Sequence, residues 1–366
     1  MLYFLASHIE PDGGLLRTLY LGQAPLPRAI PEILEAEVPV LNEGSYDGHF
    51  FAQIAVDPTL QREDLQRALD RPGYRARRIL LPGLAWLGGL GQGVWAIHVH
   101  TWLNLIFFGA FLLWFVRRFP LDELRTWGLG CALFWSSGTL YSCWRALADF
   151  PAAVLGVWAL FWIGRRRWGA TGWMAAAILA KETMVLSLLA QLEPKRWRSL
   201  LLIPLAILPF ALWMVYIHFF VGLAPSAGYQ NFSGIPFQAF WGESRQHLEG
   251  YFSRSNIITL SFAVAPWCLL FQAIYLWARP GIHSAAWRFG LGFTVLLAFL
   301  GPSVWVDVAA YSRVLLPLTF AFNFYLYERE RGGLFWVLLI PANVGLWFWP
   351  YYMRILIQGG HVWTWG

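Results

Sequence analysis

The chain separates near residue 78 into a polar N-terminal part and a longer part in which apolar segments alternate with short basic clusters. Apolar segments of this kind predict membrane-spanning helices, although several are only about 14 residues long and a crossing helix needs roughly 20. The segments that we predict to cross are Val94–Val116, Trp127–Tyr141, Phe150–Ile163, Leu200–Phe220, Ile257–Trp277, Phe289–Val306, Val314–Tyr327 and Leu334–Pro350. The predicted fold is all-α: residues 79–366 form a polytopic transmembrane helical bundle, and residues 1–78 form a polar loop region with short interfacial helices.

Three segments follow other patterns. Leu84–Gly93 is short and interrupted by glycines, which favours a half-helix or a re-entrant segment. Trp168–Leu192 carries Lys181 and Glu182 at its middle and has basic clusters at both ends, so we expect two half-length helices that meet near Lys181. His49–Ala55 alternates polar and apolar residues unevenly, which predicts a short helix lying along the membrane interface.

The distribution of lysine and arginine predicts the orientation, because cytoplasmic loops carry an excess of both. After residue 94 most of these residues fall in alternate short loops, which we place in the cytoplasm. Residues 42–78, a mixed loop at 221–256 and a loop at 307–313 then share the outer face. Any functional site formed by these three segments is accordingly expected on the outer face of the membrane.

Composition narrows the class of protein. The 366 residues are 58% hydrophobic and 13% charged and include 23 tryptophans, which excludes an ordinary soluble domain. The net charge of +6 is spread over short clusters between apolar runs, so nucleic acid is not an expected partner. Cys131, Cys143 and Cys268 lack metal-ligand spacing and predict neither a zinc site nor a disulfide framework. The sequence requires no cofactor, and a divalent metal stays an open alternative.

The first residues leave two interpretations open. Met1–Ala6 is too short for the apolar core of a signal peptide. Either the polar region reaches the outer face because of the spans that follow, or the sequence starts within a first transmembrane helix whose beginning is missing. We favour the second interpretation.

The polar region contains the leading candidates for chemistry. Asp47 stands beside Gly48, which lets the backbone bend and a bulky partner approach the carboxylate, so Asp47 is the candidate general base. Arg75, Arg77 and Arg78 directly precede an apolar run, at a depth where guanidinium groups pair with lipid phosphates. The alternative is that these arginines only anchor the chain at the membrane surface.

The second candidate group lies within the predicted bilayer. A buried lysine is costly without a partner, and Lys181 and Glu182 point about 100° apart on a helix and cannot simply pair with each other. We therefore expect Lys181 to meet Asp149 or a ligand phosphate. The alternatives are a buried ion pair that only fixes helix packing, and an Asp149 that caps the helix beginning there.

Several motifs resemble a known family. They are Tyr46-Asp47-Gly48-His49-Phe50-Phe51, Asp57-Pro58, Tyr74-Arg75-Ala76-Arg77-Arg78-Ile79-Leu80-Leu81-Pro82, Ala148-Asp149-Phe150-Pro151, Ala180-Lys181-Glu182-Thr183 and Tyr311-Ser312-Arg313-Val314-Leu315-Leu316-Pro317. In order and predicted side of the membrane they are similar to those of bacterial integral-membrane glycosyltransferases of the GT-C superfamily, across most of residues 42–320. The sequence departs from that pattern in lacking a complete helix before the first loop.

The resemblance implies an enzyme of the bacterial inner (plasma) membrane that transfers a hexosyl or mannosyl group from a polyprenyl-phosphate donor to an acceptor hydroxyl. Asp47 would be catalytic, and supporting residues would be Tyr46, Asp149, Glu182 and Asp307. The donor phosphate would meet Arg75, Arg77, Arg78, Lys181 and Arg313. The alternatives are a transporter or flippase, which normally shows a pseudo-repeat that this sequence lacks, and a non-catalytic assembly subunit. The sugar and the acceptor are not implied.

Overall fold

The computed structural model describes residues 14–42, 44–193, 200–224, 231–254 and 257–347. The helix predicted before the polar region, the basic cluster after Leu192 and the end of the predicted span Leu334–Pro350 lie outside these residues. Within them the protein is mostly helical, and its strands form one short parallel pair in which Leu21 lies opposite Val40 and Gly22 opposite Leu41.

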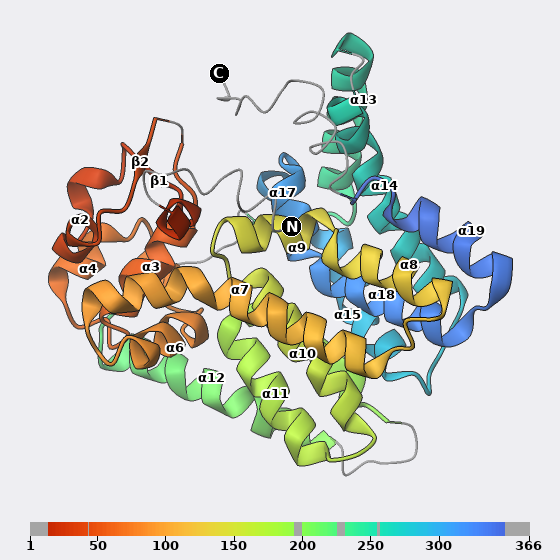
Figure 1. Cartoon of the computed structure of the whole chain (residues 1–366), viewed down its shortest axis with the longest axis horizontal. Helices are drawn as coiled ribbons and strands as arrows, with labels where there is room; N and C mark the ends of the chain where they lie inside the picture. Colours follow the sequence, from red (N-terminus) through yellow and green to blue (C-terminus); the bar gives the residue numbers. More distant parts are fainter. Residues whose placement is uncertain (1–13, 43, 194–199, 225–230, 255–256, 348–366) are drawn as a thin grey trace.

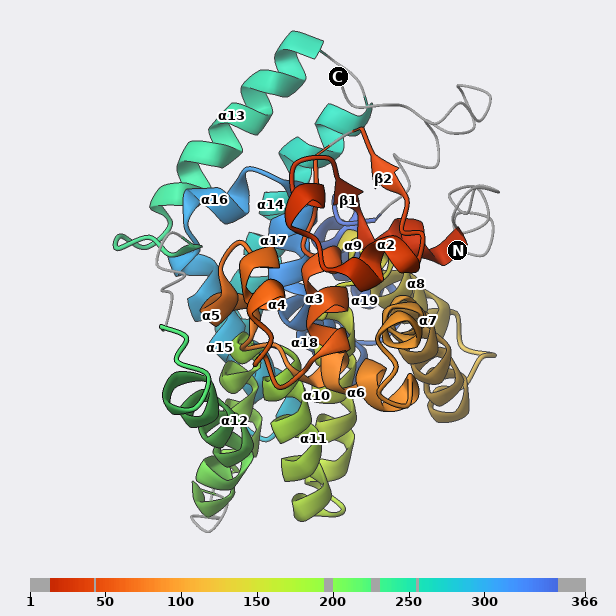
Figure 2. The same ribbon diagram turned by 90° about the vertical axis from the view of Figure 1, so that its left-hand side faces the viewer.

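The N-terminal part is a series of short elements, gathered at one side of the molecule (Figure 1). In chain order they are η1 (Gly14–Leu19), β1 (Leu21–Gly22), η2 (Leu26–Arg28), α2 (Pro31–Glu35), β2 (Val40–Leu41), α3 (Gly48–Val56), α4 (Glu63–Ala68) and α5 (Pro72–Arg75). They enclose their own hydrophobic core, which includes Leu19, Phe51 and Leu65 and is completed by Ile97 and Ile217 from later helices. Figure 2 views the molecule from this side.

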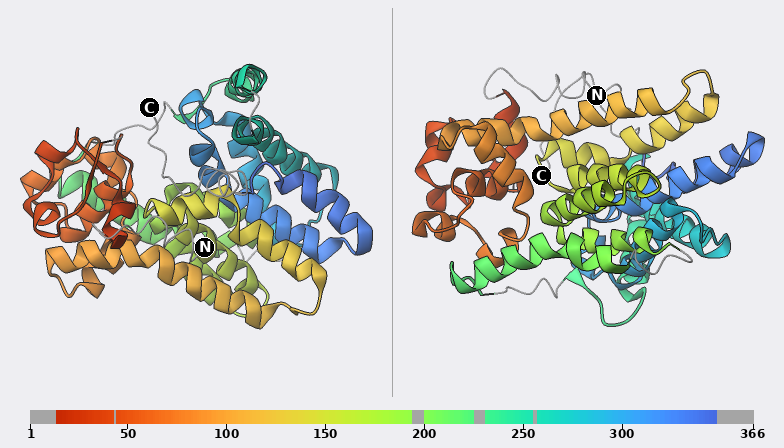
Figure 3. Two further views of the ribbon diagram at one scale, coloured as in Figure 1. Left: turned by 45° about the horizontal axis from the view of Figure 1, so that its top comes forward. Right: turned by 90° about the horizontal axis from the view of Figure 1, so that it is seen from below.

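The remaining elements are longer helices joined by short connections. They are α6 (Leu80–Gly88), α7 (Gly93–Arg118), α8 (Leu124–Phe134), α9 (Ser137–Trp144), α10 (Asp149–Ile163), α11 (Arg167–Ala180), η3 (Glu182–Gln191), α12 (Leu202–Phe219), α13 (Gln238–Arg254), α14 (Ile257–Ala278), α15 (Ala285–Phe299), α16 (Pro302–Trp305), α17 (Val308–Val314), α18 (Leu316–Arg329) and α19 (Gly332–Asn343). The apolar helix α10 is buried along nearly its whole length, as expected for a helix that is hydrophobic on every face. The right-hand view of Figure 3 shows α7 and α12 along opposite sides of α10 and α11.

Three described helices are long and apolar enough to cross a membrane: Gly93–Arg118, Leu202–Phe219 and Thr259–Ala278. α12 is the most exposed of them, since only 11% of its apolar window is buried inside the molecule. An exposed apolar helix surface of this extent is unfavourable in water and favourable in contact with lipid. The helical fold and the membrane character predicted from the sequence are confirmed at this level. The further apolar helices α10, α15 and α19 are shorter than a full crossing.

The break predicted near Lys181 is present. Helix α11 ends at Ala180, Lys181 has an extended backbone (φ −156°, ψ 121°), and η3 begins at Glu182. The break directs the adjacent Lys181 and Glu182 side chains to different partners. The predicted short helix before Val94 is also present, as α6.

Other local predictions were wrong. α3 does not lie along an interface, because α6 and α7 pack against it and all of its residues are buried. The predicted span Trp127–Tyr141 is divided into α8 and α9, since the Ser136 side chain accepts a hydrogen bond from the Thr139 amide and starts a new helix. The capping residues of such breaks are weak signals within an apolar run.

The two predicted outer loops contain helices. α13 occupies much of the region 221–256, where Phe240 is fully buried against Trp305 and Arg245 pairs with Glu249 one turn on. α17 fills the predicted loop 307–313, because Asp307 accepts a hydrogen bond from the Ala309 amide and caps it. Charged and polar residues within α13, and the short length of α17, explain why both segments were predicted to be loops.

Candidate functional site

Asp47 lies at the start of α3 in a buried cluster of charges. One oxygen of its carboxylate is 2.8 Å from Nη1 of Arg75, and its side chain remains 29% exposed. The same guanidinium donates two hydrogen bonds to Asp70, each 2.9 Å long, and lies 4.6 Å from the centre of the Phe50 ring. Arg75 is therefore directed at two carboxylates. In this arrangement it orients Asp47.

Behind Asp47, His49 holds the first turn of α3 in place. Its ring nitrogens lie 3.1 Å from Ser45 Oγ and 3.2 Å from Gln53 Nε2. Burial and, to a smaller extent, the positive charge of Arg75 lower the pKa of His49 to about 4. A neutral imidazole at neutral pH suits this buried supporting role.

Gly48 brings the Asp47 loop close to the backbone of Arg145. A Cβ atom at residue 48 would lie 2.4 Å from the Arg145 carbonyl oxygen and 3.1 Å from that of Leu19. The sequence interpretation was that Gly48 leaves room for a bulky partner of Asp47. The atoms that approach are instead main-chain oxygens of the protein itself, so Gly48 is required for packing.

Arg78 connects the N-terminal part to the broken helix. Its Nε and Nη2 donate to the two oxygens of Glu182, each at 3.0 Å, and Nη2 also donates to the Tyr74 hydroxyl at 2.8 Å. This planar, two-pronged pairing suits an arginine and fixes both side chains. Arg77 lies nearby, with its guanidinium carbon 5.8 Å from the centre of the Tyr74 ring.

Asp149 is the centre of a second buried group. Lys181 donates to one of its oxygens, and Arg313 donates to the other at 2.9 Å. Arg313 also donates to the Tyr46 hydroxyl, which links this group to the residue before Asp47. The contact between Lys181 and Asp149 expected from the sequence is thus present.

Asp149 does not cap α10. It lies in the first turn, while the Ser142 hydroxyl accepts a hydrogen bond from the Phe150 amide at 2.9 Å. The alternative that the Asp149 side chain caps the helix is therefore wrong. Sequence reasoning missed Ser142 because it is distant from the helix start along the chain.

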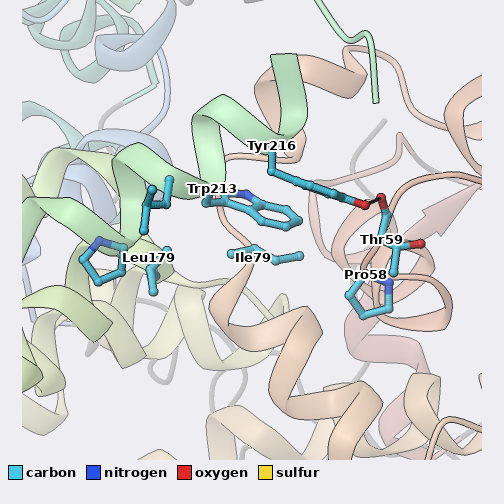
Figure 4. Close-up of a pocket in the computed structure, with 8 residues that line it drawn as sticks. Pro58, Thr59, Ile79, Leu179, Trp213 and Tyr216 are labelled. Atoms are coloured by element: carbon cyan, nitrogen blue, oxygen red, sulfur yellow. Dashed lines mark hydrogen bonds between the residues drawn. The ribbon is translucent and has the colours of Figure 1, made fainter. Parts of the chain in front are cut away.

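Two cavities flank these charges. The first, shown in Figure 4, has a volume of about 570 Å³ and is an apolar groove between α12 and the N-terminal part. It is lined by Pro58, Thr59, Ile79, Leu179, Pro209, Leu212, Trp213 and Tyr216. Tyr216 donates to the Thr59 carbonyl at 2.9 Å, and Trp213 donates to the Ala76 carbonyl at 2.8 Å. These bonds attach the exposed, apolar α12 to the N-terminal part.

The second cavity has a volume of about 470 Å³ and a more polar lining. It is lined by Tyr20, Gly44, Ser45, Tyr46, Tyr141, Trp144, Arg145, Phe262, Val306 and Asp307. Each cavity adjoins the charged groups. Ile79 of the groove follows Arg78, Leu179 lies two residues before Lys181, and Tyr46 of the polar cavity accepts a hydrogen bond from Arg313. Asp307 belongs to the polar cavity and not to the Asp149 group.

Comparison of the chain with protein-family models, with curated proteins and with solved structures finds no significant match. Among the residues that the structure describes, no three His, Cys, Asp or Glu side chains are grouped to hold a metal ion. The functional argument therefore rests on the residues and their geometry.

Proposed function

We propose that the protein is a membrane glycosyltransferase that moves a sugar from a polyprenyl-phosphate donor to an acceptor hydroxyl. The observation that carries this proposal is the position of Asp47. It is a partly exposed carboxylate, oriented by Arg75 and joined through Tyr46 to buried charges that adjoin an apolar groove and a polar cavity. A lipid-linked donor and a hydrophilic acceptor need two environments of this kind.

The apolar groove provides a place for the donor's prenyl chain. Leu212, which lines it, is 60% exposed on a helix whose apolar surface fits lipid. A polyprenyl tail that extends from the bilayer into the groove would place its phosphate near the end formed by Ile79. Arg77 and Arg78 directly precede this residue, so the headgroup would meet cationic side chains there.

Asp47 provides the base. The acceptor oxygen forms a bond to the anomeric carbon of the donor while the bond from that carbon to the phosphate oxygen breaks. Asp47 takes the proton of the acceptor hydroxyl, and the polyprenyl phosphate leaves with the bonding electron pair. Attack from the face opposite the phosphate inverts the anomeric carbon.

The structural contacts assign different roles to the basic residues. Arg75, Arg78, Lys181 and Arg313 each pair with a carboxylate, so in this proposal they hold the catalytic loop in place. Arg77 and Arg78, which directly precede the groove residue Ile79, are in this proposal the basic residues nearest in the chain to the donor phosphate. The proposed protein is a multi-pass bundle of the bacterial inner membrane with residues 42–78 on the outer face. The distribution of Lys and Arg supports this orientation.

A transporter is supported less well. Transport through a shared site requires a cavity that opens alternately to both sides. The charged group beside these cavities is instead closed, because Asp149, Lys181 and Arg313 pair with one another and are at most 8% exposed. A closed group of this kind suits a fixed site better than an alternating path.

The test is transfer by the purified full-length protein in nanodiscs, from radiolabelled polyprenyl-phosphate hexoses to a lipid and glycan extract. Asp47→Asn keeps the shape of the side chain and removes the proton acceptor, so transfer should fall by about 10² to 10⁴-fold. Asp64→Asn, which changes an aspartate paired with Arg62 elsewhere in the N-terminal part, is the control. Near wild-type transfer by Asp47→Asn would contradict the assignment of the base.

A further inference from the structure

The polar cavity contains an arginine that sequence reasoning passed over. Arg145 follows α9, and its Nε and one terminal nitrogen are buried without a hydrogen-bond partner. A buried donor without a partner costs free energy, more so on a charged group. Arg145 differs in this respect from Arg75, Arg78 and Arg313, each of which donates to a carboxylate.

Aromatic rings hold this guanidinium in position. Its central carbon lies 3.9 Å from the centre of the Tyr46 ring, 5.1 Å from Tyr20, 5.4 Å from Tyr141 and 5.8 Å from Trp144. Ring faces attract a cation but do not accept its N–H groups as a carboxylate or phosphate does. The rings therefore fix the arginine at the wall of the cavity, where no carboxylate of the described residues pairs with it.

The same cavity also contains a carboxylate. Asp307 lines the same cavity, and one of its oxygens accepts from the Ala309 amide at 3.0 Å, which partly compensates its charge. A guanidinium that binds a phosphoryl group and a carboxylate that accepts hydroxyl groups together suit a sugar phosphate. The volume of about 470 Å³ lies within the range of about 300 to 1,000 Å³ that is usual for small-ligand sites.

We infer that this cavity is the acceptor site and that the acceptor is a phosphorylated sugar, whose phosphoryl group binds Arg145 while a hydroxyl group donates to Asp307. The acceptor role rests on the proposed glycosyltransferase function, whereas binding of the phosphorylated sugar does not. Gly48 places the loop of the base Asp47 directly against the Arg145 backbone. A ligand held by Arg145 is therefore next to the catalytic loop.

Binding to the full-length protein in nanodiscs tests this assignment. The probes are glucose, galactose and mannose 1-phosphates, with the uncharged hexoses and polyprenyl phosphate for comparison. We expect a hexose 1-phosphate to bind at least about 10-fold more tightly than its hexose, and Arg145→Gln to remove that preference. Arg145→Lys keeps the positive charge but loses the planar guanidinium group, so this variant should retain only part of the preference for the hexose 1-phosphate.

Arg245→Gln is the matched control, because it removes the same charge from a side chain that is 82% exposed on α13. Gly44→Phe is a second variant: Gly44 lines the cavity, and a Cβ added there meets no atom within 4 Å, so the ring should fill the cavity without disturbing the fold. It should weaken hexose 1-phosphate binding even if Arg145→Gln fails to fold.

Three outcomes would overturn the inference. The first is a hexose 1-phosphate affinity that neither variant changes, and the second is the absence of such binding in the wild type. The third is loss of polyprenyl phosphate affinity in Arg145→Gln, which would assign the cavity to the donor. If phosphosugar binding depends on Arg145 but no polyprenyl phosphate binds to the protein, the proposed function fails and the phosphosugar site stands.

Discussion

Replacement of Asp149 by asparagine tests whether the buried charges hold the site together. The side chains of Asp149 and Lys181 are each 4% exposed, and that of Arg313 is 8% exposed. Asp149→Asn leaves two buried cations facing a neutral amide. Loss of one partner from a buried ion pair costs about 3 to 5 kcal/mol, and we expect a loss of unfolding free energy in that range.

Lys181→Met should lower the free energy of unfolding by less, because Asp149 keeps its bond to Arg313. We expect a loss of about 1 to 3 kcal/mol, the value of a hydrogen bond to a charged group. In the double variant Asp149→Asn/Lys181→Met the unpaired lysine is gone, so its cost should not exceed that of Asp149→Asn alone. The resulting coupling energy should be about 1 to 3 kcal/mol.

The assay is denaturant unfolding in lipid or detergent, followed by fluorescence of the 23 tryptophans. Glu249→Gln is the control, because it breaks an exposed ion pair with Arg245 and should cost no more than about 0.5 kcal/mol. Strictly additive losses in the double variant would refute the coupling. If Asp149→Asn lowers the free energy of unfolding no more than Glu249→Gln does, burial does not strengthen these ion pairs.

Three further predictions concern the groove, the response to pH and the orientation. Leu212→Trp fills the groove and should weaken polyprenyl phosphate binding about 10-fold, whereas Leu208→Trp, on the same helix outside the groove lining, should not; equal affinities would contradict the donor site. As pH falls from 6.5 to about 4, the unfolded chain protonates His49 and the folded chain does not, so stability should fall by up to about 1.4 kcal/mol per pH unit. His49→Gln should lose less between pH 7 and pH 5, and an equal melting-temperature loss in both would refute this. An impermeant thiol reagent should reach Ser45→Cys and Ser284→Cys from opposite sides of the membrane, and labelling of both from one side would refute the orientation.

Part of the fold was predictable from local pattern. The break at Lys181 follows from the basic clusters at both ends of Trp168–Leu192, which place both ends on one side of a membrane, together with a lysine and a glutamate at its middle. The partner of Lys181 was predictable for the same reason, since a buried cation needs a nearby carboxylate. The three long apolar helices follow from length and composition.

Other contacts depend on tertiary structure and leave no local signal. Arg78 pairs with Glu182, 104 residues away in the chain, and Arg313 donates to Tyr46 across 267 residues. The polar helix α13 was mistaken for a loop because a charged segment can be either. In the sequence Arg145 is only one basic residue in a segment predicted on the outer face. Its proposed role in phosphate binding depends on aromatic rings that come from separate parts of the chain.

The ion pairs also explain why the sequence predicts more donor-phosphate residues than the structure leaves unpaired with carboxylates. Any basic residue near a predicted headgroup is a candidate ligand, but burial without an opposite charge is costly, so most such residues acquire a carboxylate partner within the protein. Arg75 pairs with Asp47 and Asp70, Arg78 with Glu182, and Lys181 and Arg313 with Asp149. In these pairs the four positive side chains balance the four carboxylates and support the loop that carries Asp47. Attraction for an anionic substrate must then come from arginines outside them, and Arg145, enclosed by rings and open to a cavity, is placed to supply it.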